Sequence, residues 1–418
     1  MKRRVVITGV GPITPIGIGK DEFWGNLIAG KSGIGLITQF DASDPGFTTK
    51  IAGEVKDFDF ANYGDKKEGK RMDRVTQFAV AAAKLAVEDA ELDLEKIDPV
   101  RAGVCVGSGI GGIHTFLEQS LKYGEKGPGK ISPFFIPMEI PNMPAGQISI
   151  ALGFKGPNTA IITACATGTN CIGDALRTIQ YGDADIMIAG GTEAAVSPVA
   201  IAGFGNMKAL STNNEHPEKA SCPFDKKRDG FVMGEGAGIL VLEEYEHAKA
   251  RGAHIYAEMV GYGNTCDAHH ITAPHPEAKG ASRAFKLALQ EAGIENLAKE
   301  TIYINAHGTS TPLNDKSETL AIKLGLGEEA ARKAYISSTK SMTGHMLGAA
   351  GAVEAIASVM TLKTGIIAPT IHYEQPDEDC DLNYVPNQAV KADVTLAISD
   401  SLGFGGHNGC IAFSKLKD

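Results

Sequence analysis

Cys165 is the residue whose type and position in this sequence most directly suggest covalent chemistry. The apolar stretch 158–164 predicts a buried strand, and residues 165–181, closed by Gly182, predict a helix. A thiol at that junction lies at the positive end of the helix dipole, which favours the thiolate, and beside free backbone N–H groups that can bind an oxyanion. These properties are typical of an acyl-accepting nucleophile, whereas Cys171 is expected to be a buried, space-filling residue.

Two histidines and a lysine occur in segments that are expected to be buried. His307 follows the apolar run TIYINA, and His345 begins an Ala/Gly-rich stretch with almost no polar face. Burial and a helix N-terminus both disfavour the imidazolium, so His345 should remain neutral and donate a hydrogen bond. Lys340 and Glu354 bracket this stretch and predict a buried ion pair. Taken singly, each histidine is also compatible with a hydrogen-bonded core residue.

A glycine-dense turn, SDSLGFGGHNG, follows the last apolar run and carries Phe404. Gly403, Gly405 and Gly406 would allow the backbone of this turn to approach a substrate closely and to move. An ordinary tight turn is the alternative interpretation.

The elements that position these residues follow a repeated pattern of strand, glycine turn and helix. Four β-branched runs occur in the first part of the chain, and a second series of four begins near residue 254. The sequence therefore predicts an α/β protein of two related halves, residues 1–253 and 254–418. Reactive groups should gather where the strand ends of both halves meet.

The composition of the 418 residues restricts the class of protein. A formal net charge of −10 speaks against a nucleic-acid binder. The seven cysteines are scattered without a C-x-x-C pair, which suits a reducing compartment and hence the cytoplasm. The start, MKRRVVITGVG, is expected to be a strand rather than a signal peptide, and no stretch approaches the roughly 20 apolar residues of a membrane helix.

Eight motifs together resemble the β-ketoacyl-acyl carrier protein synthases of the thiolase superfamily, most closely those of type II. The motifs are VVITGVGPITPIG, VGSGIGG, TACATGTN, DADIMIAGGTEA, PFDKKRDGFVMGEGAG, NAHGTSTPLND, STKSMTGHMLGAAG and SLGFGGHNG, and they extend over essentially the whole chain. The resemblance implies a thiolase-like fold, with two α-β-α-β-α halves in a five-layered core, and a homodimer. It also implies an acyltransferase without a cofactor, which condenses malonyl-acyl carrier protein with an acyl group on Cys165 and elongates fatty acids by two carbons.

The resemblance assigns roles to individual residues. It makes Cys165 the acylated nucleophile, and His307 and His345 the pair that binds the malonyl thioester carbonyl. Lys340 becomes an essential supporting charge. Phe404 becomes a gate whose backbone N–H, together with that of Cys165, forms the oxyanion hole. The positions that match the acyl-pocket wall and the pantetheine path are Ile110, Thr272, Thr309 and Thr311.

Two further sites are predicted. The resemblance requires no metal, but it suggests a monovalent cation at Asn305, Glu354 and Ser401. An acidic carrier protein needs a basic docking surface, and the candidate side chains for it are Lys66, Lys67, Lys70, Arg71 and Lys208. The chain departs from the family pattern near these sites at Asp400, His407 and Cys222.

Other classes of protein were weighed against the condensing enzyme. Gly107, Gly109 and Gly112 match the G-x-G-x-x-G of a dinucleotide-binding oxidoreductase, but a single match is weak. Ser337-x-x-Lys340 and Lys363-Thr364-Gly365 suggest a serine acyl enzyme, but the two motifs lie too close together and no S-D-N lies between them. A zinc site would use Cys266, His269, His270 and His275. A non-catalytic or polyketide-type condensing partner subunit is the alternative function, against which the presence of the cysteine and both histidines speaks.

Overall fold

The computed structural model describes residues 2–417, and its main strands form two groups of five with the same internal order. The first group is ordered β6-β5-β7-β8-β1 and the second β11-β10-β14-β15-β9. The parallel and antiparallel pairs also correspond between the groups. The strands are β1 (Val5–Thr14), β5 (Ala102–Gly107), β6 (Asn158–Thr159), β7 (Ile186–Glu193) and β8 (Gly236–Glu244), then β9 (Ala257–Cys266), β10 (Ile302–Asn305), β11 (Tyr335–Ser337), β14 (Leu396–Gly403) and β15 (His407–Ser414).

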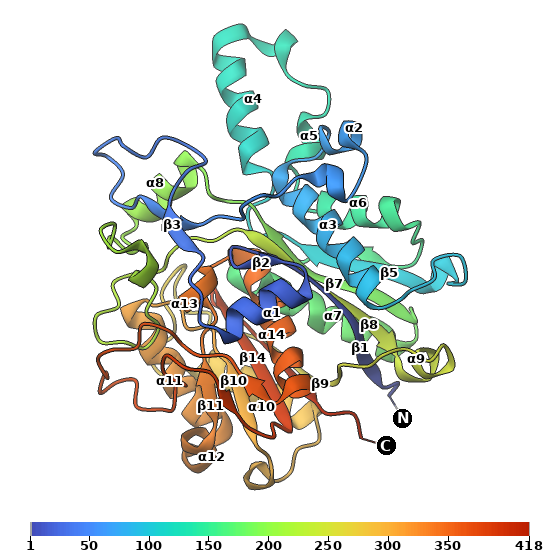
Figure 1. Cartoon of the computed structure of the whole chain (residues 1–418), viewed down its shortest axis with the longest axis vertical. Helices are drawn as coiled ribbons and strands as arrows, with labels where there is room; N and C mark the ends of the chain where they lie inside the picture. The colour runs from blue at the N-terminus through green and yellow to red at the C-terminus, as the bar shows by residue number, and fades with distance from the viewer. Residues whose placement is uncertain (1, 418) are drawn as a thin grey trace.

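Antiparallel pairing between β1 and β9 joins the two groups into one continuous sheet. Residues 5–7 of β1 pair with residues 257–259 of β9. All ten residues of β1 are buried, as are most of those in β7, β8, β14 and β15. Such strands form from continuous β-branched and apolar runs because helices cover both faces of the sheet. The two halves lie one above the other in Figure 1.

Three layers of helix complete the fold. Helices α3 (Arg74–Asp89) and α6 (Met143–Leu152) cover the outer face of the first group, and α10 (Lys279–Glu291) and α11 (Pro312–Leu326) cover that of the second. Helices α7 (Thr167–Tyr181) and α14 (Ala350–Thr364) lie between the groups and contact strands of both. The order helix, sheet, helix, sheet, helix gives the predicted five layers (Figure 1).

Small residues allow α7 and α14 to pack closely at the centre. A Cβ on Gly351 would lie 2.0 Å from Oγ1 of Thr169, and one on Gly168 would lie 2.8 Å from the backbone nitrogen of Ala352. Residues 350–362 of α14 are all buried. The Ala/Gly composition of this helix is therefore explained by close helix packing inside the core.

Further elements surround this core. Of these, α4 and α5 project from one end of the molecule (Figure 1). The helices are α1 (Lys20–Ile28), α2 (Lys66–Gly69), α4 (Ile113–Lys126), α5 (Phe135–Glu139), α8 (Pro198–Asn206), α9 (Tyr245–Ala250), α12 (Glu328–Lys333) and α13 (Lys340–Thr343). The strands are β2 (Gly17–Ile18), β3 (Ile34–Leu36), β4 (Ile51–Gly53), β12 (Ile366–Ile367) and β13 (Val390–Lys391). Within residues 2–417, no helix is both long and apolar enough to cross a bilayer.

The strand predicted over residues 158–164 is mostly wrong. Only Asn158–Thr159 pair with β5, and both residues are exposed at the edge of the sheet. The chain then leaves the sheet and enters a 3-10 turn, η4 (Ala164–Ala166), so α7 begins at Thr167 rather than at Cys165. The predicted end of α7 is correct, because Gly182 adopts the left-handed conformation, with φ 89°, that closes the helix.

Candidate active site

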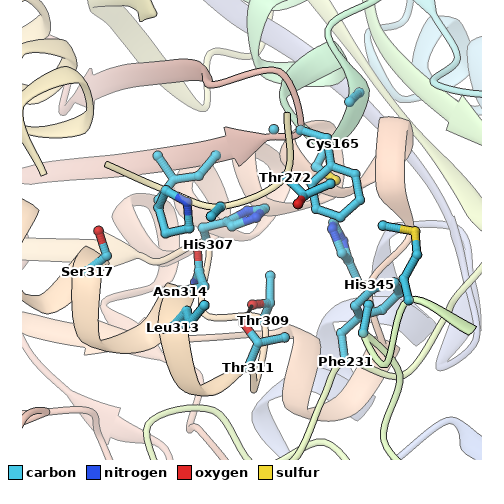
Figure 2. A pocket seen from close by; sticks show the side chains of 18 of the residues that line it. Cys165, Phe231, Thr272, His307, Thr309, Thr311, Leu313, Asn314, Ser317 and His345 are labelled. Atoms are coloured by element: carbon cyan, nitrogen blue, oxygen red, sulfur yellow. Dashed lines mark hydrogen bonds between the residues drawn. The ribbon is translucent and has the colours of Figure 1, made fainter. Parts of the chain in front are cut away.

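One cavity of about 590 Å³ brings together Cys165, His307 and His345, which are far apart in the sequence. Cys165 comes from the turn before α7, His307 from the end of β10, and His345 from the turn before α14. Figure 2 shows the three side chains converging on a common space. The cavity therefore forms where elements of both halves meet, as the sequence predicts.

Cys165 sits in a strained turn that exposes backbone donors to its sulfur. Ala164, the residue before it, has a left-handed backbone with φ 51°. The backbone N–H groups of Phe404 and of Cys165 itself both face Sγ and favour the thiolate. Gly403 makes this approach possible, because a Cβ there would lie only 2.6 Å from the carbonyl oxygen of Thr163. The turn thus has two N–H groups in the position of an oxyanion hole.

The sequence predicts a thiolate at Cys165, but in this structure the residue is a thiol. Burial is the largest influence and raises the pKa of the Cys165 thiol to about 12. The charge of Lys340 and the N–H of Phe404 lower the pKa, but they do not offset the loss of water around the sulfur. The sulfur is therefore a thiol at rest, and its proton must leave during attack.

Both histidines are buried, neutral and next to each other. Their ring centroids are 5.3 Å apart with an interplanar angle of 88°, and His345 also packs edge-on against Phe231. Burial, followed by the charge of Lys340, lowers the pKa of each imidazole well below its usual value. A neutral imidazole has one N–H to donate and one nitrogen to accept a proton.

Lys340 lies behind the cavity and forms a buried ion pair with Glu354, as predicted. Its side chain is 1% exposed, yet its charge lowers the pKa of Cys165 and of both histidines. Lys340 therefore acts on the reacting groups through its field, without lining the cavity.

The predicted cation ligands fit only in part. Asn305 and one oxygen of Glu354 are buried without a hydrogen-bond partner among residues 2–417, which suits a cation. The Ser401 hydroxyl, in contrast, is 2.7 Å from that of Thr169. Ser399, whose hydroxyl has no such partner, is paired in register with Asn305. A hydroxyl that bonds to one neighbour keeps a lone pair, so Ser401 stays a predicted ligand together with Asn305 and Glu354.

The departure at Asp400 places a second carboxyl group in this region. Asp400 is buried near Glu318, and burial raises its pKa to about 7. Burial likewise raises the pKa of Glu318 well above its usual value, and the charges of Asp400 and Asp315 raise it further. The pair is thus held mainly in protonated or proton-sharing form in the folded protein.

The residues predicted to contact substrate line the same cavity. They are Ile110, Thr272, Thr309 and Thr311, and the hydroxyls of the last two are 2.9 Å apart. Phe404 is half-buried in the wall, and the following Gly405 and Gly406 have positive φ of 86° and 76°. Sequence reasoning missed Phe204 and Phe231, because an apolar lining carries no recognisable spacing.

The predicted docking residues do not form a single patch on this chain. Those on and beside α2 are exposed and form no ion pair among residues 2–417: Lys66, Lys67, Lys70 and Arg71. Lys208 lies instead at the mouth of the cavity, after α8, which is well separated from α2 in Figure 1. Arg71 stacks on the ring of Phe134 at 4.9 Å, so α2 continues into the projecting α4–α5 region.

The structure also explains the glycine motif that suggested a nucleotide. The N–H groups of Gly109 and Ile110 donate to the buried carboxylate of Glu193 at 2.9 and 3.2 Å. They are therefore not available to a pyrophosphate. Within residues 2–417, no cluster of three or more His, Cys, Asp or Glu is arranged to hold a metal, and the proposed zinc set is not one.

Comparison with known proteins places this geometry in a wider context. Residues 2–248 match the family described as "Beta-ketoacyl synthase, N-terminal domain", and residues 256–374 match "Beta-ketoacyl synthase, C-terminal domain". The chain is 55% identical over 415 residues to a 3-oxoacyl-[acyl-carrier-protein] synthase 2 of Staphylococcus aureus (strain COL), covering 99% of each chain. It is 54% identical over 414 residues to that of Synechocystis sp., covering 99% of this chain and 98% of the other.

Solved structures share the fold over the full length. A complex of a type II PKS acyl-carrier protein with its ketosynthase bound to the hexaketide matches with a TM-score of 0.92 and 38% identity. The ishigamide ketosynthase/chain length factor matches with a TM-score of 0.91 and 39% identity. Each match covers 100% of both chains.

Proposed function

The chain belongs to the β-ketoacyl synthase family, and from that premise we propose that Cys165, His307 and His345 perform its chemistry. The enzyme is an acyltransferase that condenses malonyl-acyl carrier protein with an enzyme-bound acyl group and so elongates fatty acids by two carbons. The observation that supports the residue roles is the single cavity containing a buried thiol, two neutral imidazoles and backbone donors at the sulfur.

The first step is acyl transfer to Cys165. The sulfur attacks the thioester carbonyl of the acyl-carrier while its proton passes to a neutral imidazole, the base available in the cavity. The N–H groups of Cys165 and Phe404 hold the oxyanion, a contribution of about 100- to 1000-fold in rate for each donor. The carrier leaves as its thiol, and the imidazole returns the proton to it.

The second step is decarboxylation and condensation. Loss of carbon dioxide from the malonyl group moves negative charge onto the thioester oxygen. His307 and His345 are neutral and lie 5.3 Å apart between ring centroids, so both can donate a hydrogen bond to that oxygen. The enolate carbon then attacks the acyl carbonyl on Cys165, the C–S bond breaks to give β-ketoacyl-carrier, and the released thiolate takes up a proton from water to restore the resting thiol. Burial, reinforced by the charge of Lys340, keeps both imidazoles neutral, and the same charge stabilises the developing anions.

Two Cys165 variants test these roles. Cys165→Ala should abolish elongation, because no acyl-enzyme forms. Cys165→Gln, whose neutral amide imitates an acylated side chain, should still release carbon dioxide from malonyl-carrier. Mass spectrometry of the acyl-enzyme and a carbon dioxide assay measure the two steps separately. Normal elongation by either variant would exclude the assigned nucleophile.

A non-catalytic or polyketide-type partner subunit is the weaker alternative. The polyketide ketosynthases among the structural relatives raise it, at 38% and 39% identity. The higher identity to the 3-oxoacyl synthases and the presence of all three reacting residues favour the elongating enzyme.

We also propose that the enzyme is a homodimer. β6 is a two-residue strand at an open sheet edge, and Ile162 beyond it is 48% exposed. Further apolar side chains are exposed on or beside the α4–α5 projection and on α6: Phe116, Leu121, Phe134, Ile136 and Ile150. An open edge with apolar neighbours favours pairing with a second copy. Light scattering of Ile162→Asp, which should weaken the dimer, tests this; a monomeric unmodified chain would exclude it.

Four further proposals concern the context of the enzyme. The chain divides into halves 1–253 and 254–418, which is supported by the repeated strand order. Its seven unpaired cysteines suit the cytoplasm. A monovalent cation would be held by Asn305, Glu354 and Ser401, where it would add positive charge beside the buried acids. The carrier protein would dock on the exposed basic residues of α2, with Lys208 at the cavity mouth.

A further inference from the structure

Glu193 is a fully buried carboxyl group that the reaction steps above do not use. It is the last residue of β7 and is 0% exposed. No Lys, Arg or His among residues 2–417 forms an ion pair with it. An unpaired buried acid is costly, so its environment must compensate.

Four donors from two different turns satisfy this carboxylate. Oε1 accepts the hydroxyl of Ser108 at 2.6 Å and the N–H of Ile110 at 3.2 Å. Oε2 accepts the N–H of Gly109 at 2.9 Å and that of Gly348 at 3.0 Å. Three of the four partners are backbone N–H groups, which can only donate, and two of these face Oε2. Burial raises the pKa of Glu193, and these hydrogen bonds lower it.

The two turns form different parts of the cavity. Ile110 lines the acyl side, next to Gly109. Gly348 follows Leu347, which lines the cavity two residues after His345 and has a strained, left-handed backbone with φ 45°. Neither glycine has room for a side chain beside the carboxylate, since a Cβ on Gly109 or Gly348 would lie 2.8 or 2.9 Å from Oε2.

We propose that Glu193 is a positioning residue that ties the acyl-pocket wall at Ile110 to the turn that follows His345. The carboxylate keeps the wall that receives the acyl chain in register with the imidazole that acts on the malonyl group. This inference rests on the proposed function of the cavity. It does not make Glu193 an activator of the nucleophile, since the Glu193 charge raises the pKa of Cys165.

Glu193→Gln is the appropriate variant, because it keeps the shape and removes one acceptor. If its NH₂ group takes the place of Oε2, it faces the N–H groups of Gly109 and Gly348, one from each turn. If it takes the place of Oε1, it faces the N–H of Ile110, so in either orientation at least one backbone donor loses its acceptor. We expect kcat for condensation to fall about 10- to 100-fold, while KM for malonyl-carrier changes by less than about threefold. The ratio of rates with long and short acyl donors should move towards one. Iodoacetamide should alkylate Cys165 faster at a fixed pH, because a nearby negative charge is lost.

Glu54→Gln provides a matched control. Glu54 is also a buried carboxyl, 4% exposed, and accepts hydrogen bonds from Thr38 and Gln39, which belong to one turn only. This variant should change the thermal midpoint and none of the three kinetic readouts. If Glu193→Gln behaves like Glu54→Gln, the positioning role is refuted.

Ser108→Ala keeps the inference testable if Glu193→Gln does not fold. It removes one of the four donors and should shift the acyl-length ratio in the same direction by a smaller amount; an unchanged ratio would refute the tie. The proposed function fails separately. If Cys165→Ala still elongates, the proposed function is refuted, regardless of the result for Glu193→Gln. If Glu193→Gln has normal kinetics and Cys165→Ala is inactive, only the positioning role of Glu193 is refuted.

Discussion

Substitution of Gly403 by alanine should separate the two halves of the reaction. Gly403 ends β14 directly before Phe404, and its φ lies outside the left-handed region, so alanine fits its backbone. The obstacle is steric. A Cβ would lie 2.6 Å from the carbonyl oxygen of Thr163 and 3.3 Å from the backbone nitrogen of Cys165.

The size of the effect follows from these distances. Real Cβ atoms essentially never approach a heavy atom closer than 3.0 Å, so Thr163 and Gly403 must separate by at least about 0.4 Å. The N–H of Phe404 belongs to the next residue and moves with Gly403. A displacement of this size weakens the oxyanion donor, so acyl transfer should slow, with the about 100- to 1000-fold cost of losing one donor, about 3–4 kcal/mol, as the upper limit. The same overpacking should lower the free energy of unfolding by about 1–3 kcal/mol.

The assay measures each step alone. Transfer of an acyl group from its carrier to Cys165 is followed by mass spectrometry in Gly403→Ala. Malonyl decarboxylation is followed in Gly403→Ala combined with Cys165→Gln, where it should stay within about threefold of Cys165→Gln alone. Gly203→Ala is the control, since a Cβ there meets nothing within 4 Å although Phe204 beside it lines the cavity.

Two results would refute the reasoning. Acyl transfer at the unmodified rate would show that the Phe404 N–H is not an oxyanion donor. An equal loss of acyl transfer and decarboxylation would show that the substitution disturbs the cavity as a whole.

Three further predictions follow from charge and burial. Lys340→Met leaves the Glu354 carboxyl buried without its partner and should cost about 3–5 kcal/mol in urea unfolding, whereas the double variant with Glu354→Gln should cost less; equal costs would contradict the buried pair. Because burial raises the pKa of Cys165 to about 12, its alkylation by iodoacetamide should accelerate about tenfold per pH unit below that value, and a plateau near neutral pH would contradict this. Lys67→Glu with Lys70→Glu should raise the carrier KM, less so in high salt, whereas reversing a lysine on α9 should not; an unchanged KM removes the docking surface.

Much of the fold and the core of the site could be predicted from the sequence. Glycines after β-branched runs mark the strand ends, and the placement of Cys165, His307 and His345 after such runs follows from them. The Ala/Gly composition of α14 similarly predicts that this helix is buried at the centre of the molecule. Because burial disfavours the charged imidazolium, the same composition predicts a neutral histidine beside it. These features depend on local patterns that a single chain displays directly.

Other features depend on contacts between distant segments. The thiol state of Cys165 results from burial by both halves, which outweighs the local helix terminus. The stretch 158–164 has the composition of a strand, yet it has a pairing partner for only two residues. Local propensity therefore fails where tertiary pairing or burial decides the outcome.

The turns before α7 and α14 occupy equivalent positions in the duplicated fold. α7 and α14 are both 15 residues long. Each follows a 3-10 turn whose first residue, Ala164 or Leu347, has a left-handed backbone with φ of 51° or 45°. Gly348 in the second half therefore occupies the position of Cys165 in the first.

The strand that faces each turn decides what its N–H can do. β7 and β14 are both eight residues long, and they end at the equivalent residues Glu193 and Gly403. Glu193 accepts the N–H of Gly348, so that donor is occupied. Gly403 has no side chain, and the N–H of Cys165 has no acceptor beyond its own sulfur among residues 2–417. We therefore propose that the turn at Cys165 serves as the oxyanion site because a glycine leaves its donor free, while Glu193 occupies the donor of the other turn.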